Sequence, residues 1–324
     1  MLQTAQAPAR LKGVMSPVLT PFKADLTPSP ARFVKHCRWL LAQGVGLSVF
    51  GTNSEANSLT VNEKRGLLDA LLEAGLPSTR MMPGTGTCAL PDTIELTRHA
   101  VESGCAGVLM LPPFFYKGVS DEGLFRSYAQ VIDAVQDDRL RIYLYHIPPV
   151  AQVGITRTLI ERLLKAYPGV VAGIKDSSGD WENTRMLLTE FQPHGFDVFA
   201  GSETILLETL RGGGAGCITA TGNVNPSAIL RLYREWQSDD ADVQQAALNR
   251  TRAAFKAFPL IAAMKAAIAA KSGDAGWATL RPPLVELSAE QGRQLMCVLD
   301  ELGFEVPQAH ELTELPEIAI ASHV

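Results

Sequence analysis

The run VVAGIKDSSGD at residues 170–180 contains the structural unit that decides the fold. Its small and apolar residues, 170–174, are typical of a strand that is buried on both faces. A helical segment at 180–191 follows within a few residues. The strand ends in Lys175, which is unusual, because an ammonium group that loses water costs several kcal/mol unless it is neutralised or paired. The stretch therefore predicts a buried strand that ends in a lysine with a special environment.

Strand alternation predicts that Lys175 lies on the same side as Gly173 and Val171, and that Asp176 points to the opposite face. The nearest carboxylate is then badly placed to hold the lysine protonated. Desolvation lowers the pKa of a lysine, and a neutral amine at the mouth of a pocket can attack a ketone to form a Schiff base. The alternative is a solvated lysine at a strand end, because lysine is rarely fully buried.

The same alternation of strand and helix recurs along most of the chain. A helix start is predicted at Ser29-Pro30, with serine as N-cap and proline at the first helical position. Thr60 and Glu63 have the spacing of a capping box. Eight strands are predicted, each followed by a helix, at residues 13–19, 47–50, 81–83, 107–111, 141–146, 170–175, 197–200 and 215–219.

Eight such units in an α/β chain predict a (β/α)8 TIM barrel with parallel strands. An open doubly wound sheet is the alternative, but it would require a glycine fingerprint after the first strand, and none is there. The predicted organisation is a lead-in at 1–12, the barrel at 13–238, and a C-terminal helical domain with a tail at 239–324. Helices are expected at 241–257, 259–271 and 288–302, and a peripheral tail from about residue 306.

Composition excludes several classes of function. The chain has 324 residues, a net charge of −5 and no basic stripe, so no nucleic-acid partner is expected. It has no apolar run that would span a bilayer and no signal pattern at its start, so no membrane partner is expected and a cytoplasmic location is predicted. The five scattered cysteines fit reduced thiols, and neither the cysteines nor the six histidines have metal-ligand spacing. No metal and no cofactor is expected.

Active sites of such barrels lie at the carboxyl ends of the strands. The loop GTNSE at 51–55 has backbone N–H groups and small polar side chains that could hold a carboxylate, or it is a tight turn before a helix. Tyr145 ends a strand where it could transfer a proton, whereas His146 faces the other way and is predicted to be a packing residue. The aromatic residues at 114–116 fit a subunit contact. A Gly-rich mouth is expected at 212–216 and 220–223, although it lacks a phosphate-binding pattern.

Four segments, taken together, resemble the dihydrodipicolinate synthase/N-acetylneuraminate lyase family. They are GTNSE at 51–55, YHIP at 145–148, GIKD at 173–176 and GSE at 201–203, and the resemblance extends from about residue 13 to 300. Members of that family are barrels with a C-terminal helical domain, typically homotetramers formed by two dimers. They bind pyruvate, or a 2-keto acid that releases it, as a Schiff base.

By position, the resemblance implies that Lys175 is the Schiff-base lysine and Tyr145 the adjacent proton-transfer residue. Thr52 and Asn53 would hold the carboxylate of the keto acid. Thr52 would also link Tyr145 to Tyr116, which would reach across from a partner subunit. Ile218 would lie in the pyruvate pocket and act through its backbone.

Two departures from the family pattern bear on the substrate. The synthases usually carry Thr-Thr-Gly-Glu where this chain has TNSE at 52–55, and an arginine where it has Val150. That arginine grips the carboxylate of the second substrate, so its loss argues against true 4-hydroxy-tetrahydrodipicolinate synthesis. The hypothesis is a class I lyase or aldolase for pyruvate or a 2-keto-3-deoxy sugar acid. A sugar-acid dehydratase, a true synthase, a keto-acid-binding barrel without turnover and, more distantly, a phosphate-dependent barrel enzyme are the alternatives.

Overall fold

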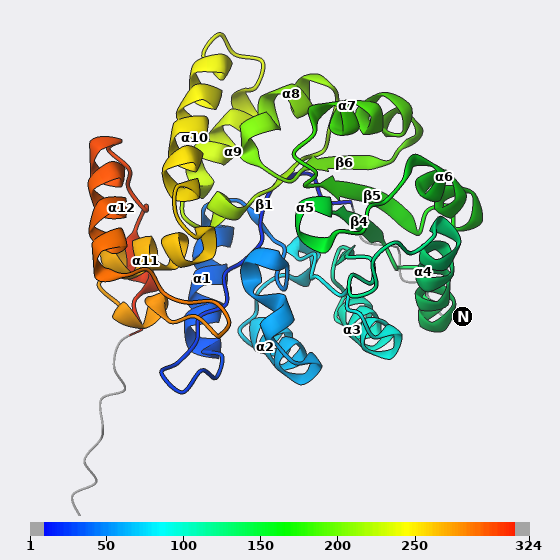
Figure 1. Ribbon diagram of the computed structural model, residues 1–324, viewed down its shortest axis with the longest axis horizontal. Coiled ribbons are helices and arrows are strands. Elements are labelled where there is room, and N and C mark those ends of the chain that lie inside the picture. Colours follow the sequence, from blue (N-terminus) through cyan, green and yellow to red (C-terminus); the bar gives the residue numbers. More distant parts are fainter. Residues whose placement is uncertain (1–9, 315–324) are drawn as a thin grey trace, which may run out of the picture.

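The computed structural model describes residues 10–314, and its strands form one curled parallel sheet (Figure 1). The order in the sheet is β2-β1-β7-β6-β5-β4-β3, and each strand is parallel to its neighbours. The seven strands are β1 (Gly13–Ser16), β2 (Gly46–Leu47), β3 (Val108–Met110), β4 (Ile142–His146), β5 (Val171–Asp176), β6 (Asp197–Ala200) and β7 (Gly216–Ile218).

The segment 81–83, predicted to be a strand, forms only isolated bridges to the sheet. The Met82 N–H donates to the carbonyl of Leu47 in β2 at 2.8 Å, and the Leu109 N–H in β3 donates to the carbonyl of Pro83 at 2.9 Å. The segment thus touches both edge strands. Pro83 has no N–H to donate, which interrupts regular pairing. The prediction of eight regular strands is therefore wrong at this point, and residues 10–314 contain seven.

Helices follow the strands and surround the sheet in Figure 1. Two of them begin where the sequence predicts: the Ser29 hydroxyl accepts from the Arg32 N–H, and Thr60 and Glu63 form the predicted capping box. The four-residue α5 was not predicted. The helices up to β7 and just beyond it are α1 (Pro30–Ala42), α2 (Val61–Glu73), α3 (Leu90–Glu102), α4 (Asp121–Val135), α5 (Pro148–Ala151), α6 (Arg157–Ala166), α7 (Trp181–Glu190), α8 (Leu206–Arg211) and α9 (Pro226–Glu235).

Two hydrophobic clusters form the core, one between the sheet and the helices and one inside the curled sheet. In β4 the alternation is regular: Ile142 and Leu144 pack in the outer cluster, and Tyr143 and Tyr145 in the inner one. In β5 the pairing with β4 shifts in register opposite Ile142 and Tyr143, and this shift changes which residues of β5 face each cluster. Val171 packs in the outer cluster, so the prediction that it shares a face with Lys175 is wrong.

Three further helices follow the last strand, namely α10 (Ala241–Lys256), α11 (Leu260–Ser272) and α12 (Ala289–Glu301). They gather on one side of the molecule in Figure 1, where α10 packs on α9 and α11 packs on α12. Within residues 10–314 no single helix has the length and apolar character needed to cross a bilayer. Only α10 and α11 taken together have the length and apolar composition of a membrane span, and they are bent by 101° relative to each other.

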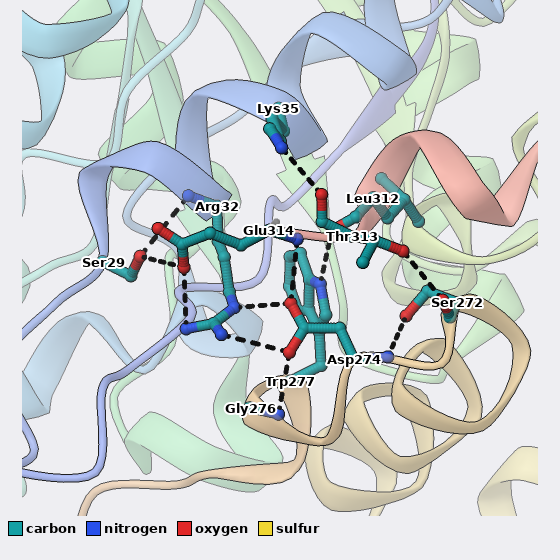
Figure 2. A network of polar contacts seen from close by, with 10 residues as sticks. All are labelled: Ser29, Arg32, Lys35, Ser272, Asp274, Gly276, Trp277, Leu312, Thr313 and Glu314. Atoms are coloured by element: carbon teal, nitrogen blue, oxygen red, sulfur yellow. Dashed lines mark hydrogen bonds and ion pairs between the residues drawn. The ribbon is translucent and has the colours of Figure 1, made fainter. Parts of the chain in front are cut away.

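The last described residues, up to 314, are packed against the molecule, contrary to the predicted peripheral tail. Figure 2 shows the contacts: Arg32 of α1 bridges Asp274, at 2.8 Å, and Glu314, at 3.0 Å, and the Trp277 indole donates to the carbonyl of Leu312 at 3.0 Å. Near the other end, Arg10 donates to a carbonyl of β5, so the end of the predicted lead-in is packed as well. The remaining parts of the predicted lead-in (1–9) and tail (315–324) lie outside the described residues.

Candidate active site

A cavity of about 570 Å³ opens at the carboxyl ends of β4, β5 and β6 and is bordered by α10. Four residues predicted from the sequence line it together: Thr52, Asn53, Tyr145 and Lys175. They come from segments that are far apart in the chain. They meet because the carboxyl ends of parallel strands lie at one edge of the sheet.

Lys175 is 2% exposed, and its ammonium group makes no hydrogen bond or ion pair with any residue between 10 and 314. Its Nζ atom lies 4.2 Å from the centre of the Tyr145 ring. Asp176 points to the other face of β5, as alternation predicts. There its carboxylate accepts from Thr184 Oγ1 at 2.7 Å and Asn183 Nδ2 at 3.0 Å. The carboxylate next in sequence therefore does not neutralise the lysine.

Gly173, two residues before Lys175, allows the strands to pack closely below the lysine. A Cβ atom at this position would lie 2.3 Å from the carbonyl oxygen of Asp197 and 2.9 Å from the ring of Tyr143. Only glycine leaves room for both. The lysine is thus supported by a rigid, filled sheet interior rather than by an open channel.

The loop that carries Thr52 and Asn53 is held in an uncommon backbone conformation. Phe50 and Glu55 flank it with φ angles of 62° and 54°, in a region that non-glycine residues rarely adopt. Between them Thr52–Ser54 forms one 3₁₀ turn. Thr52 Oγ1 lies 3.1 Å from the hydroxyl of Tyr145. The loop therefore links directly to the tyrosine beside Lys175.

Glu55 connects this loop to α11. Its carboxylate accepts from Lys265 Nζ, and the side chains of both residues are fully buried. The same carboxylate accepts from the Arg281 N–H at 3.2 Å, and Lys265 also donates to the carbonyl of Thr279 at 2.9 Å. Burial lowers the pKa of Lys265, and the Glu55 carboxylate opposes that change. The pair fixes the loop against the C-terminal helices.

Two predicted site residues do not reach the cavity. Ile218 of β7 is buried in the inner cluster and does not line it. Tyr116 is 73% exposed, stacks edge-to-face on the equally exposed Phe115, and lies outside the cavity wall.

His146 and the glycine-rich segment at 212–216 also do not line the cavity. His146 is buried and its Nδ1 accepts from the Ile155 N–H at 2.9 Å, which confirms the prediction of a packing residue. Burial lowers its pKa. Residues 212–215 precede β7 and therefore lie at the amino edge of the sheet, opposite the cavity. The predicted Gly-rich mouth is wrong for this segment, whereas Ala220, after β7, does line the cavity.

The sequence reasoning missed two cavity residues, Arg252 and Lys256 of α10. Arg252 forms an ion pair with the buried carboxylate of Glu203, at 3.3 Å. Two basic residues four apart on a helix are an ordinary surface pattern. The one available signal was Glu203 in the GSE segment, a carboxylate at a strand end that requires a partner.

Comparison with known proteins identifies a family and a fold for almost the whole described chain. Residues 10–302 match the model of the dihydrodipicolinate synthetase family. An uncharacterized DapA-like lyase from Chloroflexus aurantiacus is 34% identical, over 91% of this chain and 98% of its own length. The crystal structure of dihydrodipicolinate synthase from Agrobacterium tumefaciens superposes with a TM-score of 0.83, at 30% identity, over 90% of this chain and 99% of that one.

A second solved structure contains a ligand. It is a prophage protein of the dihydrodipicolinic acid synthase family from E. coli K12, in complex with pyruvate. Its TM-score is 0.82 at 27% identity, over 92% of this chain and all of that one, 100%. The family match covers nearly all described residues, and the chain belongs to the dihydrodipicolinate synthetase family.

Proposed function

We propose that the protein is a class I lyase or aldolase that forms a Schiff base between Lys175 and pyruvate or a 2-keto-3-deoxy sugar acid. One observation carries the proposal: a buried lysine without a charge partner among residues 10–314 lies 4.2 Å from the ring of Tyr145, in the wall of a cavity. A lysine in that setting suits nucleophilic attack on a ketone. The pyruvate in the complex of the E. coli family member supports the same class of ligand.

The reaction begins with attack of the Lys175 amine on the C2 carbonyl, and water leaves as the iminium forms. The iminium accepts the electron pair of the bond that breaks. In aldol cleavage this is the C3–C4 bond: Tyr145 takes the proton of the C4 hydroxyl, an aldehyde departs, and the enamine is protonated at C3. In dehydration a proton leaves C3 and hydroxide leaves C4. Water then hydrolyses the iminium and returns the free lysine.

Tyr145 moves these protons through its contact with Thr52. The hydroxyl groups are 3.1 Å apart, so either can donate to the other. We assign Thr52 and Asn53 to the substrate carboxylate, because their backbone N–H groups begin a 3₁₀ turn at the cavity wall. Ile218 belongs to the same inner cluster as Tyr145 and does not line the cavity, so we assign it a supporting role and no contact with the substrate.

Val150 directs the choice of substrate. It lines the cavity at the position where the synthases carry an arginine, and this uncharged residue is 62% exposed. This favours a sugar acid over the second substrate of 4-hydroxy-tetrahydrodipicolinate synthesis.

We infer that the sheet and the segment 81–83 form a closed (β/α)8 barrel, and that the described residues from 239 to 314 form a helical domain. Phe115 and Tyr116, which are 71% and 73% exposed, support a contact with a second copy that delivers Tyr116 to the partner's Thr52. A homotetramer built from two such dimers follows from the family resemblance.

Product analysis with a panel of 2-keto-3-deoxy acids tests the function. Release of pyruvate and an aldehyde indicates aldol cleavage, whereas a dehydrated acid with all carbons retained indicates a dehydratase. Loss of turnover in Lys175→Arg, which keeps a positive charge but cannot form the iminium, ties either reaction to the lysine. Binding of pyruvate without turnover of any acid in the panel would instead identify a keto-acid-binding protein.

A further inference from the structure

The cavity is larger than a three-carbon acid requires. Its volume of about 570 Å³ lies within the range of pockets that enclose whole small molecules. Lys175 and Tyr145 occupy one part of its wall, and α10 contributes Arg252 and Lys256 to another. A ligand that fills this space therefore meets the lysine at one end and a basic helix face elsewhere.

The charges around the cavity do not cancel. The residues that line it include three basic ones, Lys175, Arg252 and Lys256, and one acidic one, Asp176. Asp176 is occupied by hydrogen-bond donors from α7. The carboxylate of Glu203, behind the wall, pairs with Arg252. Lys256 forms no ion pair or hydrogen bond within residues 10–314, so one positive charge remains for a ligand.

Arg252 is held firmly in place. The Glu203 carboxylate, whose side chain is 1% exposed, accepts from the hydroxyls of Thr219 and Thr221 as well as from Arg252. Gln245 of α10 donates to the Glu203 carbonyl at 2.8 Å. The helix is thus tied to the loop after β6. Lys256 lies one turn beyond Arg252, on the same side of α10.

Hydroxyl groups lie along the wall as well. They belong to Ser177 and Ser178, after β5, and Ser202 and Thr204, after β6. Such side chains both donate to and accept from the hydroxyls of a polyol.

From these observations, and resting on the proposed function, we infer that the substrate is a polyhydroxylated 2-keto acid with a second anionic group at its far end. Arg252 and Lys256 bind that group, and the serine and threonine hydroxyls contact the chain between. A terminal carboxylate and a terminal phosphate share this chemistry, and both are tested below. Arg252 and Lys256 thus act as specificity-determining residues at a distance from the bonds that react.

The test uses three 2-keto-3-deoxy acids of equal chain length and stereochemistry, ending in a primary alcohol, a carboxylate or a phosphate. We expect the wild-type kcat/KM to be about 10- to 100-fold higher for one or both anionic acids. Lys256→Met should remove that advantage and leave the alcohol-terminated acid unchanged, and Lys256→Arg should restore it. Lys165→Met, at an exposed lysine of α6 outside the cavity, is the matched control.

Pyruvate tests the Schiff base independently of the anionic subsite, because it has no second anionic group. Inactivation by borohydride in the presence of pyruvate should be equal in the wild type and in Lys256→Met. If pyruvate reacts but the three acids are turned over equally, or if Lys256→Met affects all three alike, the anionic subsite is wrong and the proposed function stands. If no keto acid forms an adduct with the wild type, the proposed function itself is wrong.

Discussion

Lys175 and Tyr145 are direct register partners on the neighbouring strands β5 and β4, so that the amine lies over the face of the phenol ring. Two rigid strands fix this relationship, and neither residue depends on a mobile loop. Such fixed placement suits two groups that act on the same substrate, here the Lys175 amine as nucleophile and the Tyr145 hydroxyl as proton-transfer group.

Tyr145→Phe should reduce kcat by about 100- to 10,000-fold, because the hydroxyl that transfers the proton is removed. Thr52→Val should reduce kcat as well, while Thr52→Ser, which keeps the hydroxyl 3.1 Å from that of Tyr145, should retain most of it. Steady-state kinetics on the best substrate of the panel provide the measurement. Equal activities of Thr52→Val and Thr52→Ser would show that the hydroxyl contact has no role in proton transfer.

Lys265→Met should lower the free energy of unfolding by about 3–5 kcal/mol, because it leaves the Glu55 carboxylate buried without its cation. Adding Glu55→Gln to Lys265→Met should recover part of this loss. Lys271→Met, on the same helix, is the control: its partner Asp300 is largely exposed, and a loss of about 1 kcal/mol or less is expected. Urea unfolding measures all three. Similar losses for the two lysines would contradict a structural role for the buried pair.

His36 should make the stability depend on pH. Its Nε2 lies 3.1 Å from Asn223 Oδ1, its Nδ1 is buried without a partner in the described part of the chain, and burial lowers its pKa from 6.5 to about 4. Above pH 6.5 the ring is neutral in both the folded and the unfolded states. As the pH falls from 6.5 to about 4, only the unfolded state gains the proton, so the free energy of unfolding decreases, by on the order of 3 kcal/mol in total.

The measurement for His36 is urea unfolding at pH 7 and pH 5, compared with His36→Gln. The variant is expected to be less stable at pH 7 and to lose less stability on acidification. His146, which is also buried, is unchanged in both proteins and cancels in the comparison. The same pH dependence in the two proteins would refute the assignment.

Tyr116→Ala should reduce turnover if the tyrosine completes a partner's site, although it does not line the cavity of its own chain. Phe115→Ser should weaken the association of the chains, because that side chain is 71% exposed. Analytical ultracentrifugation and kinetics at several protein concentrations measure the two effects. A monomer with full activity would rule out the shared site.

Local chemistry made much of this fold predictable from the sequence. Helix starts at Ser29 and Thr60 depend on side chains a few residues apart, and the structure has both caps. Lys175 and Tyr145 could be predicted to lie in one site, because the ends of parallel strands meet at one edge of the sheet. Pro83 was harder to interpret, because it lies between two strands yet cannot donate to a ladder.

The contribution of the C-terminal helices could not be predicted in the same way. Arg252 and Lys256 are ordinary basic residues of a helix, and only the fold brings them to the cavity. Lys265 had a detectable signal, a lone charge in the alanine-rich stretch LIAAMKAAIAA at 260–270, but the sequence does not identify Glu55 as its partner. The β5 register shift that turns Val171 outward is likewise a consequence of pairing with β4, which local alternation does not contain.

The most direct test of the central claim is to locate the covalent adduct. The protein is incubated with pyruvate and borohydride, digested, and its peptides are identified by mass spectrometry. The account predicts one reduced pyruvyl group on the peptide that contains Lys175, and none on the same peptide of Lys175→Ala. An adduct on Lys256 or Lys265, or one that persists in Lys175→Ala, would contradict it.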